Sequence, residues 1–161
     1  MTFEEMLPLI QAELAEEAIV RVDENCTPKA VELKKEALVE AMQFLHKTEG
    51  LYFDQLSCIT ALDNGPEAAT MELIYQLYSI PYNHQLTIKV TIDRATPEID
   101  SLTAIWKTAD WHEREAYDLL GVRFTGHPDL RRILLPADWE GHPLRKDYKH
   151  QEYYRGVKVE Y

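Results

Sequence analysis

The stretch QLTIKVTID, residues 85–93, alternates apolar and polar side chains with a period of two residues. Its members fall into two sets, which are Leu86, Ile88, Val90 and Ile92 on one side and Thr87, Lys89 and Thr91 on the other. Because successive side chains of a strand point to opposite faces of a sheet, this pattern predicts a strand with one buried and one wet face. Such strands are typical of antiparallel sheets, which often leave one face open to water.

Two further strand-like runs lie upstream, at residues 51–62 and 70–79. Turn-forming clusters separate the three runs, namely Asp63-Asn64-Gly65-Pro66 and Pro81-Tyr82-Asn83. Nearer the N-terminus, residues 18–22 and 29–33 are candidates for short strands on either side of a turn. The sequence therefore predicts a small sheet built from mixed or antiparallel strands.

Apolar residues at helical spacing predict three helices, at residues 3–17, 34–47 and 109–120. Thr2 and Glu5 have the spacing of a capping box, which places the start of the first helix at residue 3. Pro8 conflicts with that start, because a proline past the first turn clashes with a preceding carbonyl, so a start at Pro8 is the alternative. Gly50 and Gly121 are positioned to end the second and third helices.

The predicted fold class is α+β, with a small mixed or antiparallel sheet packed against helices over residues 1–121. Ser101 is expected to cap one more short helix that runs through Trp106. Beyond Gly121, glycine, proline and charged residues recur too often for regular structure. We therefore expect residues 122–161 to form an extended C-terminal arm, called the arm below, with one short strand at residues 133–135.

The formal charge of −11 is concentrated in the first two thirds of the chain. Residues 1–110 hold 8 Lys and Arg against 19 Asp and Glu, whereas residues 111–161 hold 9 of each. An acidic body argues against nucleic acid as a partner, because phosphate contacts need clustered basic residues. Without a secretion signal or an apolar run near 20 residues, the chain is expected to be soluble and to reach a membrane only through partners.

The residues of this chain do not have the spacing that familiar catalytic and metal-binding motifs require. His112-Glu113 begins like a zinc-protease motif, but the position that needs the second histidine is Ala116. Cys26 and Cys58 lie far apart, and two cysteines cannot hold an iron–sulfur cluster that needs about four thiolates. One alternative stays open, which is a stand-alone metalloenzyme that uses His112, His127, His142 and His150.

The stretch from Trp111 to Tyr148 carries charged and aromatic residues that a surface rarely gathers without a function. Arg114 and Asp118 are one helical turn apart and are expected to pair. Tyr, Trp and Arg are the residue types enriched at interface hot spots, and an irregular arm cannot bury them alone. We therefore predict a partner interface that comprises Trp111, Glu113, Arg114, Glu115, Asp118, His127, Asp129, Arg131, Arg132, Trp139, His142, Arg145, Lys146, Asp147 and Tyr148.

Three motifs in this stretch occur in order, namely EREAYDLL at 113–120, GHPDLRRIL at 126–134 and PLRKDY at 143–148. Together they closely resemble the signature of the thirty-kilodalton subunit of respiratory complex I, also called its C subunit. The family pattern has Glu-Arg-Glu, an acidic residue before two apolar ones, a spaced histidine, a basic residue and two further apolar residues. The chain fills every position, although Leu120 stands where many members have Phe.

The resemblance implies an oxidoreductase subunit without a redox centre of its own, in the quinone module of a proton-translocating NADH:quinone oxidoreductase. It would contact the large quinone-pocket subunit, around which the arm would wrap, and the small iron–sulfur subunit. Arg114, Arg131 and Arg132 would pair with carboxylates of these neighbours, and His127 and His142 would form hydrogen bonds at the interface.

FMN, iron–sulfur clusters and quinone would belong to the complex, and no cofactor, metal or catalytic residue to this chain. The complex would place the chain on the cytoplasmic side of the cell membrane, as a peripheral component. The alternative within the superfamily is the equivalent subunit of a membrane-bound [NiFe] hydrogenase-type complex.

Overall fold

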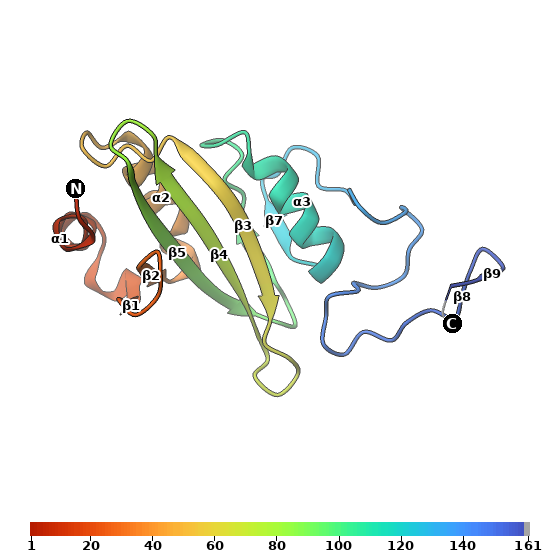
Figure 1. Ribbon diagram of the computed structural model, residues 1–161. Coiled ribbons are helices and arrows are strands. Elements are labelled where there is room, and N and C mark those ends of the chain that lie inside the picture. The colour runs from red at the N-terminus through yellow and green to blue at the C-terminus, as the bar shows by residue number, and fades with distance from the viewer. Residues whose placement is uncertain (160–161) are drawn as a thin grey trace.

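The computed structural model describes residues 1–159, which form a sheet packed with helices and followed by an arm (Figure 1). The α-helices are α1 (Phe3–Glu13), α2 (Leu38–Lys47) and α3 (Ala109–Leu120), with short 3-10 helices at Glu16–Ala18 and Lys35–Ala37. The strands are β1 (Ile19–Asp23), β2 (Ala30–Leu33), β3 (Gln55–Asp63), β4 (Thr70–Ser79), β5 (His84–Asp93), β6 (Glu98–Asp100), β7 (Arg123–Thr125), β8 (Tyr153–Tyr154) and β9 (Val157–Lys158). The predicted α+β class is confirmed.

The main sheet has five strands in the order β1-β2-β5-β4-β3. It is mixed, because β2 and β5 run parallel while the other neighbours run antiparallel. On β5, the apolar set of the alternating stretch pairs with buried residues of β4, as in Ile88 opposite Tyr75 and Val90 opposite Leu73. The period-two prediction is therefore confirmed, and β3 is left as an edge strand beside α3 (Figure 1).

The core lies between one face of the sheet and the helices α1 and α2, and Ala116 and Leu120 of α3 also belong to it. Each helix contributes an apolar stripe, with Phe3, Met6 and Ile10 from α1 and Leu38, Ala41, Met42 and Leu45 from α2. The opposite face of β4 carries half-buried side chains that include Glu72 and Gln76. Burial on one side alone explains why the strand pattern was readable from the sequence.

The first helix begins at Phe3, and Pro8 lies inside it. Thr2 donates its backbone N–H to the Glu5 carboxylate at 2.8 Å, which is the capping-box contact that the spacing predicted. The alternative start at Pro8 was wrong, because the cap and the buried stripe together outweigh the loss of one helical hydrogen bond. No helix in the described part of the chain is both long and apolar enough to span a bilayer.

Two short elements were predicted wrongly, and two strand pairs were missed. Residues 101–108 form turns rather than a helix, and residues 133–135 form a loop rather than a strand. β6 and β7 form a parallel pair that the sequence patterns did not indicate, and β8 and β9 form a missed hairpin. Val122 and Phe124 are buried, so the first residues after Gly121 pack into the core.

Candidate partner interface

Helix α3 packs against β3 through its apolar side and presents its other sides to the arm (Figure 1). Gly121 ends the helix in the left-handed conformation, with φ of 78°. A side chain at Gly121 would also lie 2.7 Å from the His142 ring and 2.9 Å from the guanidinium of Arg145. The predicted stop is thus confirmed, and the arm passes so close to the helix end that only glycine fits.

Glu113 is fully buried on the inner side of α3. Its carboxylate accepts hydrogen bonds from the Ser101 hydroxyl at 2.6 Å and from the backbone N–H of Leu102 at 2.7 Å. Burial raises the pKa of Glu113 to about 7, although both hydrogen bonds oppose the change and Asp110 adds to it. Glu113 therefore holds the turn after β6 against α3, in place of the helix cap predicted at Ser101.

The His127 side chain is also buried, and both of its ring nitrogens have partners in the chain. Nδ1 accepts the backbone N–H of Asp129 at 3.0 Å, so the ring hydrogen lies on Nε2. Nε2 is 3.2 Å from the carbonyl of Asp110 and 4.0 Å from the Glu113 carboxylate. The Gly-His-Pro unit at residues 126–128 is thus fixed against the N-terminal half of α3.

Asp118 is buried on the side of α3 that faces the arm. One carboxylate oxygen accepts three successive backbone N–H groups at 2.8–3.0 Å, those of Ile133, Leu134 and Leu135. The other oxygen binds the guanidinium of Arg132 at 2.7 Å. Burial raises the pKa of Asp118, but these hydrogen bonds outweigh it, and the pKa lies below its usual value.

The contacts of Asp118 correct two predictions. The expected strand at residues 133–135 is absent because its N–H groups turn toward one carboxylate instead of a neighbouring strand. The expected pair between Arg114 and Asp118 is also absent, since Arg114 donates to the carbonyls of Arg131 and Arg132.

A second Gly-His-Pro unit, at residues 141–143, lies at the C-terminal end of α3. His142 bonds the carbonyl of Asp118 at 2.9 Å, Leu144 donates its N–H to Leu119 at 3.0 Å, and Arg145 donates to Leu120 at 2.7 Å. Burial lowers the pKa of His142, and the neighbouring guanidinium groups add to that effect. The carbonyls that every helix leaves unpaired at its end are thus satisfied by the arm.

An ion-paired cluster, called the carboxylate clasp below, joins the arm to the sheet. Asp63, at the end of β3, accepts two hydrogen bonds from Arg94 at 2.7 and 3.0 Å and one from the backbone N–H of Lys146 at 2.8 Å. Arg94 also pairs with Asp147. Arg94 and the N–H donors hold the pKa of Asp63 well below its usual range, against the effect of burial.

Asp63 and Arg94 were not predicted from the sequence as parts of this site. They lie 31 residues apart, and Asp63 is 83 residues from Lys146, so no local motif connects them. The signal available was weak: an aspartate and an arginine each follow a predicted strand.

The outer part of the arm is held together by its own aromatic residues. Trp139 donates from its indole to the hydroxyl of Tyr148 at 3.1 Å, and its ring centre lies 5.3 Å from that of Tyr154. Asp138 pairs with Arg155 at 2.7 Å and accepts the Tyr154 hydroxyl. The arm thus buries part of its aromatic surface internally, contrary to the expectation that it could not.

The structure divides the fifteen predicted interface residues into two groups. Those with buried or half-buried side chains contact the arm, α3 or the sheet, namely Glu113, Arg114, Asp118, His127, Arg132, Trp139, His142, Arg145 and Tyr148. The others are exposed, namely Trp111, Glu115, Asp129, Arg131, Lys146 and Asp147. Arg132, predicted to bind a neighbour, binds Asp118 instead. The partner-interface role of all fifteen stays a prediction.

The metalloenzyme alternative receives no geometric support from its four histidines. His127 and His142 are engaged with the chain's own backbone, and the His150 ring contacts Tyr148. Among residues 1–159, no group of three or more His, Cys, Asp and Glu side chains is placed to hold a metal ion.

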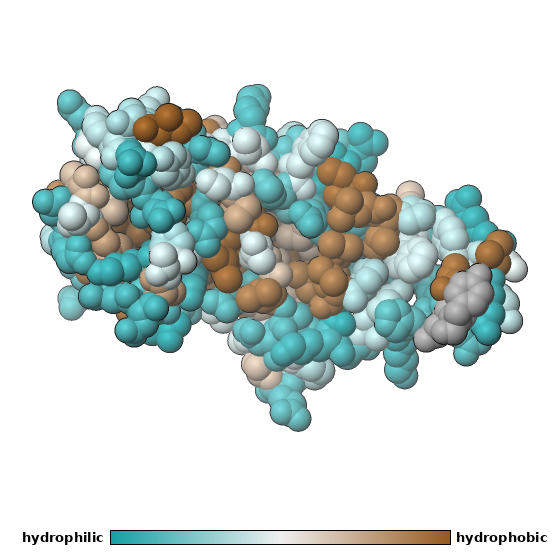
Figure 2. Space-filling model, viewed as in Figure 1, coloured by the Kyte–Doolittle hydropathy of each residue, from teal (hydrophilic) through white to brown (hydrophobic). Residues whose placement is uncertain are grey.

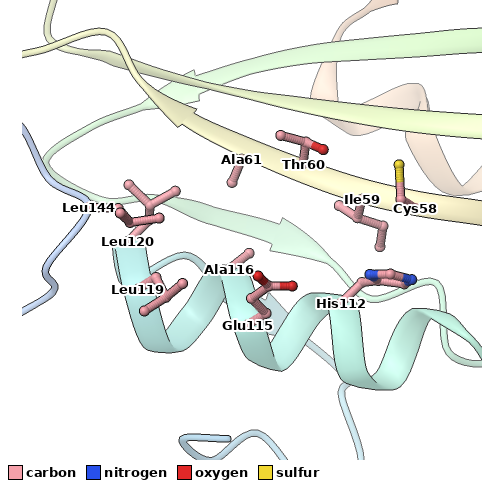
Figure 3. Close-up of a pocket in the computed structure, with 10 residues that line it drawn as sticks. All are labelled: Cys58, Ile59, Thr60, Ala61, His112, Glu115, Ala116, Leu119, Leu120 and Leu144. Atoms are coloured by element: carbon pink, nitrogen blue, oxygen red, sulfur yellow. The ribbon is translucent and has the colours of Figure 1, made fainter. Parts of the chain in front are cut away.

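A groove of about 250 Å³, called the edge groove below, lies between β3 and α3 (Figure 3). Its lining is formed by Cys58, Ile59, Thr60 and Ala61 of β3, by His112, Glu115, Ala116, Leu119 and Leu120 of α3, and by Leu144 of the arm. Figure 2 shows hydrophobic side chains gathered in the part of the molecule where α3 and the arm meet. Exposed apolar residues there include Trp111, Leu134 and Leu144.

A family model described as the respiratory-chain NADH dehydrogenase 30 Kd subunit matches residues 31–154. The NADH-quinone oxidoreductase C subunit of Chloroherpeton thalassium is 49% identical over 119 residues, which are 73% of this chain and 49% of that protein. The corresponding protein of Moorella thermoacetica is 44% identical over 132 residues, with 82% and 87% covered. That of Salinispora tropica is 39% identical over 146 residues, with 90% and 58% covered. The aligned part is thus about half the length of the first relative.

Solved structures that are similar to this one include the following two. The trypsin-resistant fragment (1–134) of Nqo5 aligns with a TM-score of 0.66 at 27% identity, over 81% of this chain and 100% of that chain. A chain of the membrane-bound sulfane sulfur reductase, an archaeal respiratory membrane complex, aligns with a TM-score of 0.75 at 20% identity, over 91% and 85%. The second likeness concerns the fold alone.

Proposed function

The chain belongs to the family of the respiratory-chain NADH dehydrogenase 30-kilodalton subunit, and on this basis we propose that it is a scaffold subunit of an NADH:quinone oxidoreductase. In this role it holds the large quinone-pocket subunit and the small iron–sulfur subunit in place within the quinone module. The complex transfers electrons and translocates protons across the cell membrane, and this chain is a peripheral component on the cytoplasmic side. The three relatives compared by sequence are all C subunits of NADH-quinone oxidoreductases, so the hydrogenase-type alternative is not favoured.

The observation that carries the scaffold role is the way in which α3 and the sheet hold the arm. The buried carboxylates of Asp118 and Asp63 accept hydrogen bonds from the backbone of the arm at two places. A third contact is made by Arg145 of the arm, which donates to the carbonyl of Leu120 at the end of α3. Such contacts fix the course of the arm before any partner binds, which lowers the entropy cost of association. A pre-organised surface of this kind suits a subunit that positions its neighbours.

The chemistry is assigned to other subunits of the complex, which hold the FMN, the iron–sulfur clusters and the quinone. In this chain, the ionisable side chains Glu113 and His127 of the signature form hydrogen bonds within the chain. Glu113 accepts from Ser101 and Leu102, and His127 bonds Asp110 and Asp129. Removing the Glu113 or His127 side chain would therefore change the local structure of the subunit and would not remove a group that takes part in the reaction.

The test is co-purification of the tagged full-length chain with its partners from membranes, followed by mass spectrometry. Stoichiometric recovery of a quinone-pocket subunit and an iron–sulfur subunit supports the proposal. Recovery of the chain alone would overturn it.

A variant at the tip of the arm tests whether that tip docks. Tyr153 and Val157 of the β8–β9 hairpin are 60% and 64% exposed, and their double change to Ser should reduce the recovery of partners. Ile80 is equally exposed, at 61%, but lies in the turn after β4, so Ile80→Ser is the matched control. Equal recovery with both variants would show that the hairpin is not a docking element.

A further inference from the structure

The edge groove is a surface that the arm does not fill. Its lining includes small and aliphatic residues such as Ala61, Ala116 and Leu119 (Figure 3). Leu144, 58% exposed, extends the apolar surface outward at the end of α3. A volume of about 250 Å³ lies below the roughly 300–1,000 Å³ of pockets that enclose small ligands, so it suits inserted side chains better than a cofactor.

The backbone of β3 bordering this groove is free for pairing. β3 is an edge strand, and its ladder with β4 uses only one side of its backbone. In the described part of the chain, the Thr108 hydroxyl, which bonds the carbonyl of Leu56, is the only group that bonds the other side. Free edges of this kind accept an extended segment of another chain through backbone hydrogen bonds.

The charge of the groove indicates what that segment carries. Glu115 is the one carboxylate in its lining, is exposed, and takes part in no ion pair among residues 1–159. It belongs to a chain of net charge −11. A cationic side chain beside an apolar one would therefore complement the groove in both charge and hydrophobicity.

We propose that the edge groove receives an extended segment of another subunit of the complex, with an aliphatic side chain inserted between β3 and α3 and a Lys or Arg paired with Glu115. This inference rests on the proposed function, because it takes the occupant from the same assembly. It adds a second docking surface that is separate from the β8–β9 hairpin, which lies far from the groove (Figure 1).

The two cysteines of the chain provide a built-in test. Cys58 lines the groove, Cys26 lies in the loop between β1 and β2 at the opposite edge of the sheet, and both are half-buried free thiols. Alkylation with N-ethylmaleimide is followed by mass spectrometry in the isolated full-length chain and in the purified complex. The expected result is a slowing of Cys58 modification in the complex by about tenfold or more, with Cys26 changed much less.

The charge is tested by Glu115→Arg, with Glu40→Arg on the exposed side of α2 as the matched control. Glu115→Arg should restore the reactivity of Cys58 in complex that still assembles through the arm, and Glu40→Arg should not. A photo-reactive benzoylphenylalanine in place of Thr60 should cross-link to a segment of another subunit that has Lys or Arg within a few residues of an aliphatic one.

Three outcomes overturn the inference while leaving the proposed function intact. These are an intact complex in which Cys58 stays as reactive as in the isolated chain, cross-links to a second copy of this chain, and cross-links to an acidic or helical segment. Failure of the chain to enter any complex would instead overturn the proposed function.

Discussion

The carboxylate of Asp118 satisfies three backbone N–H groups and one guanidinium, all from the arm. Asp118→Asn keeps the size of the side chain but removes its charge and one acceptor. Breaking a buried, hydrogen-bonded charge pair costs about 3–5 kcal/mol, so we expect the free energy of unfolding to fall by about 3 kcal/mol. Urea denaturation measures this change.

Asp129→Asn is the control for that prediction. Asp129 also pairs with an arginine, Arg131, but both side chains are exposed. Exposed pairs contribute roughly 0–1 kcal/mol, so the control should stay within about 1 kcal/mol of the unaltered chain. Equal losses in the two variants would contradict the role given to Asp118.

Glu113 makes the stability of the fold depend on pH. Its pKa rises from the ordinary value of 4.5 to about 7 on burial, so the folded state binds the proton more tightly than the unfolded state between these values. Its contribution to stability is therefore present at low pH and is lost as pH rises through the folded-state pKa. Glu113→Gln, which cannot ionise, should remove this loss.

From pH 5 to pH 8 the unfolding free energy of the unaltered chain should fall by about 2.5 kcal/mol more than that of Glu113→Gln, at about 1.36 kcal/mol per pKa unit. Denaturation curves at several pH values measure it. Parallel pH profiles of the two proteins would show that Glu113 does not titrate in this range.

At the level of elements, the end of α3 requires glycine at position 121 both for its positive φ and because the His142 ring lies close to it. Two alanine variants separate these two effects. Gly121→Ala meets both a positive φ and the His142 ring, whereas Gly126→Ala meets a positive φ of 82° and has no atom within 4 Å. We expect Gly126→Ala to cost about 1 kcal/mol and Gly121→Ala clearly more, with faster proteolysis of the arm. Similar stabilities would mean that the arm does not press against the helix end.

The elements also show what the sequence could predict. Residues 85–93, α2 and the stop at Gly121 were correct because each depends on a local rule, either a period or a glycine. The helix expected after Ser101 and the strand expected at residues 133–135 were wrong because distant carboxylates, Glu113 and Asp118, take their polar groups. Local patterns do not carry such tertiary contacts.

At the level of the candidate site, several residues that the sequence assigned to a partner interface make contacts within the chain instead. The charges of residues 111–148 suggested pairing with a partner, but much of that charge is neutralised inside the chain, as between Arg132 and Asp118. The carboxylate clasp was missed because the fold brings its members together from three separate regions. The partner-interface role of this stretch therefore stays a prediction.

In the whole molecule, the carboxylate clasp is the contact that ties the arm to the sheet. Arg94→Ala leaves the buried carboxylate of Asp63 without its cation, so we expect hydrogen exchange to speed up at residues 143–148. Residues 133–135, held by Asp118, should keep their protection. Hydrogen exchange with mass spectrometry measures both segments, and Arg21→Ala at the other edge of the sheet is the control. Unchanged exchange at residues 143–148 would contradict the clasp.

The three N–H groups bound by Asp118 belong to residues that are synthesised after α3, so their hydrogen bonds to Asp118 form late during synthesis. Since the ribosome works from the N-terminus, the sheet and α3 leave it before Ile133, at roughly 5–20 residues per second. For that interval the carboxylate of Asp118 stays hydrated and the end of α3 stays open. The arm is therefore the last part of the described chain to settle, and a nascent chain that stops before Ile133 leaves the carboxylate of Asp118, buried in the finished fold, exposed to water.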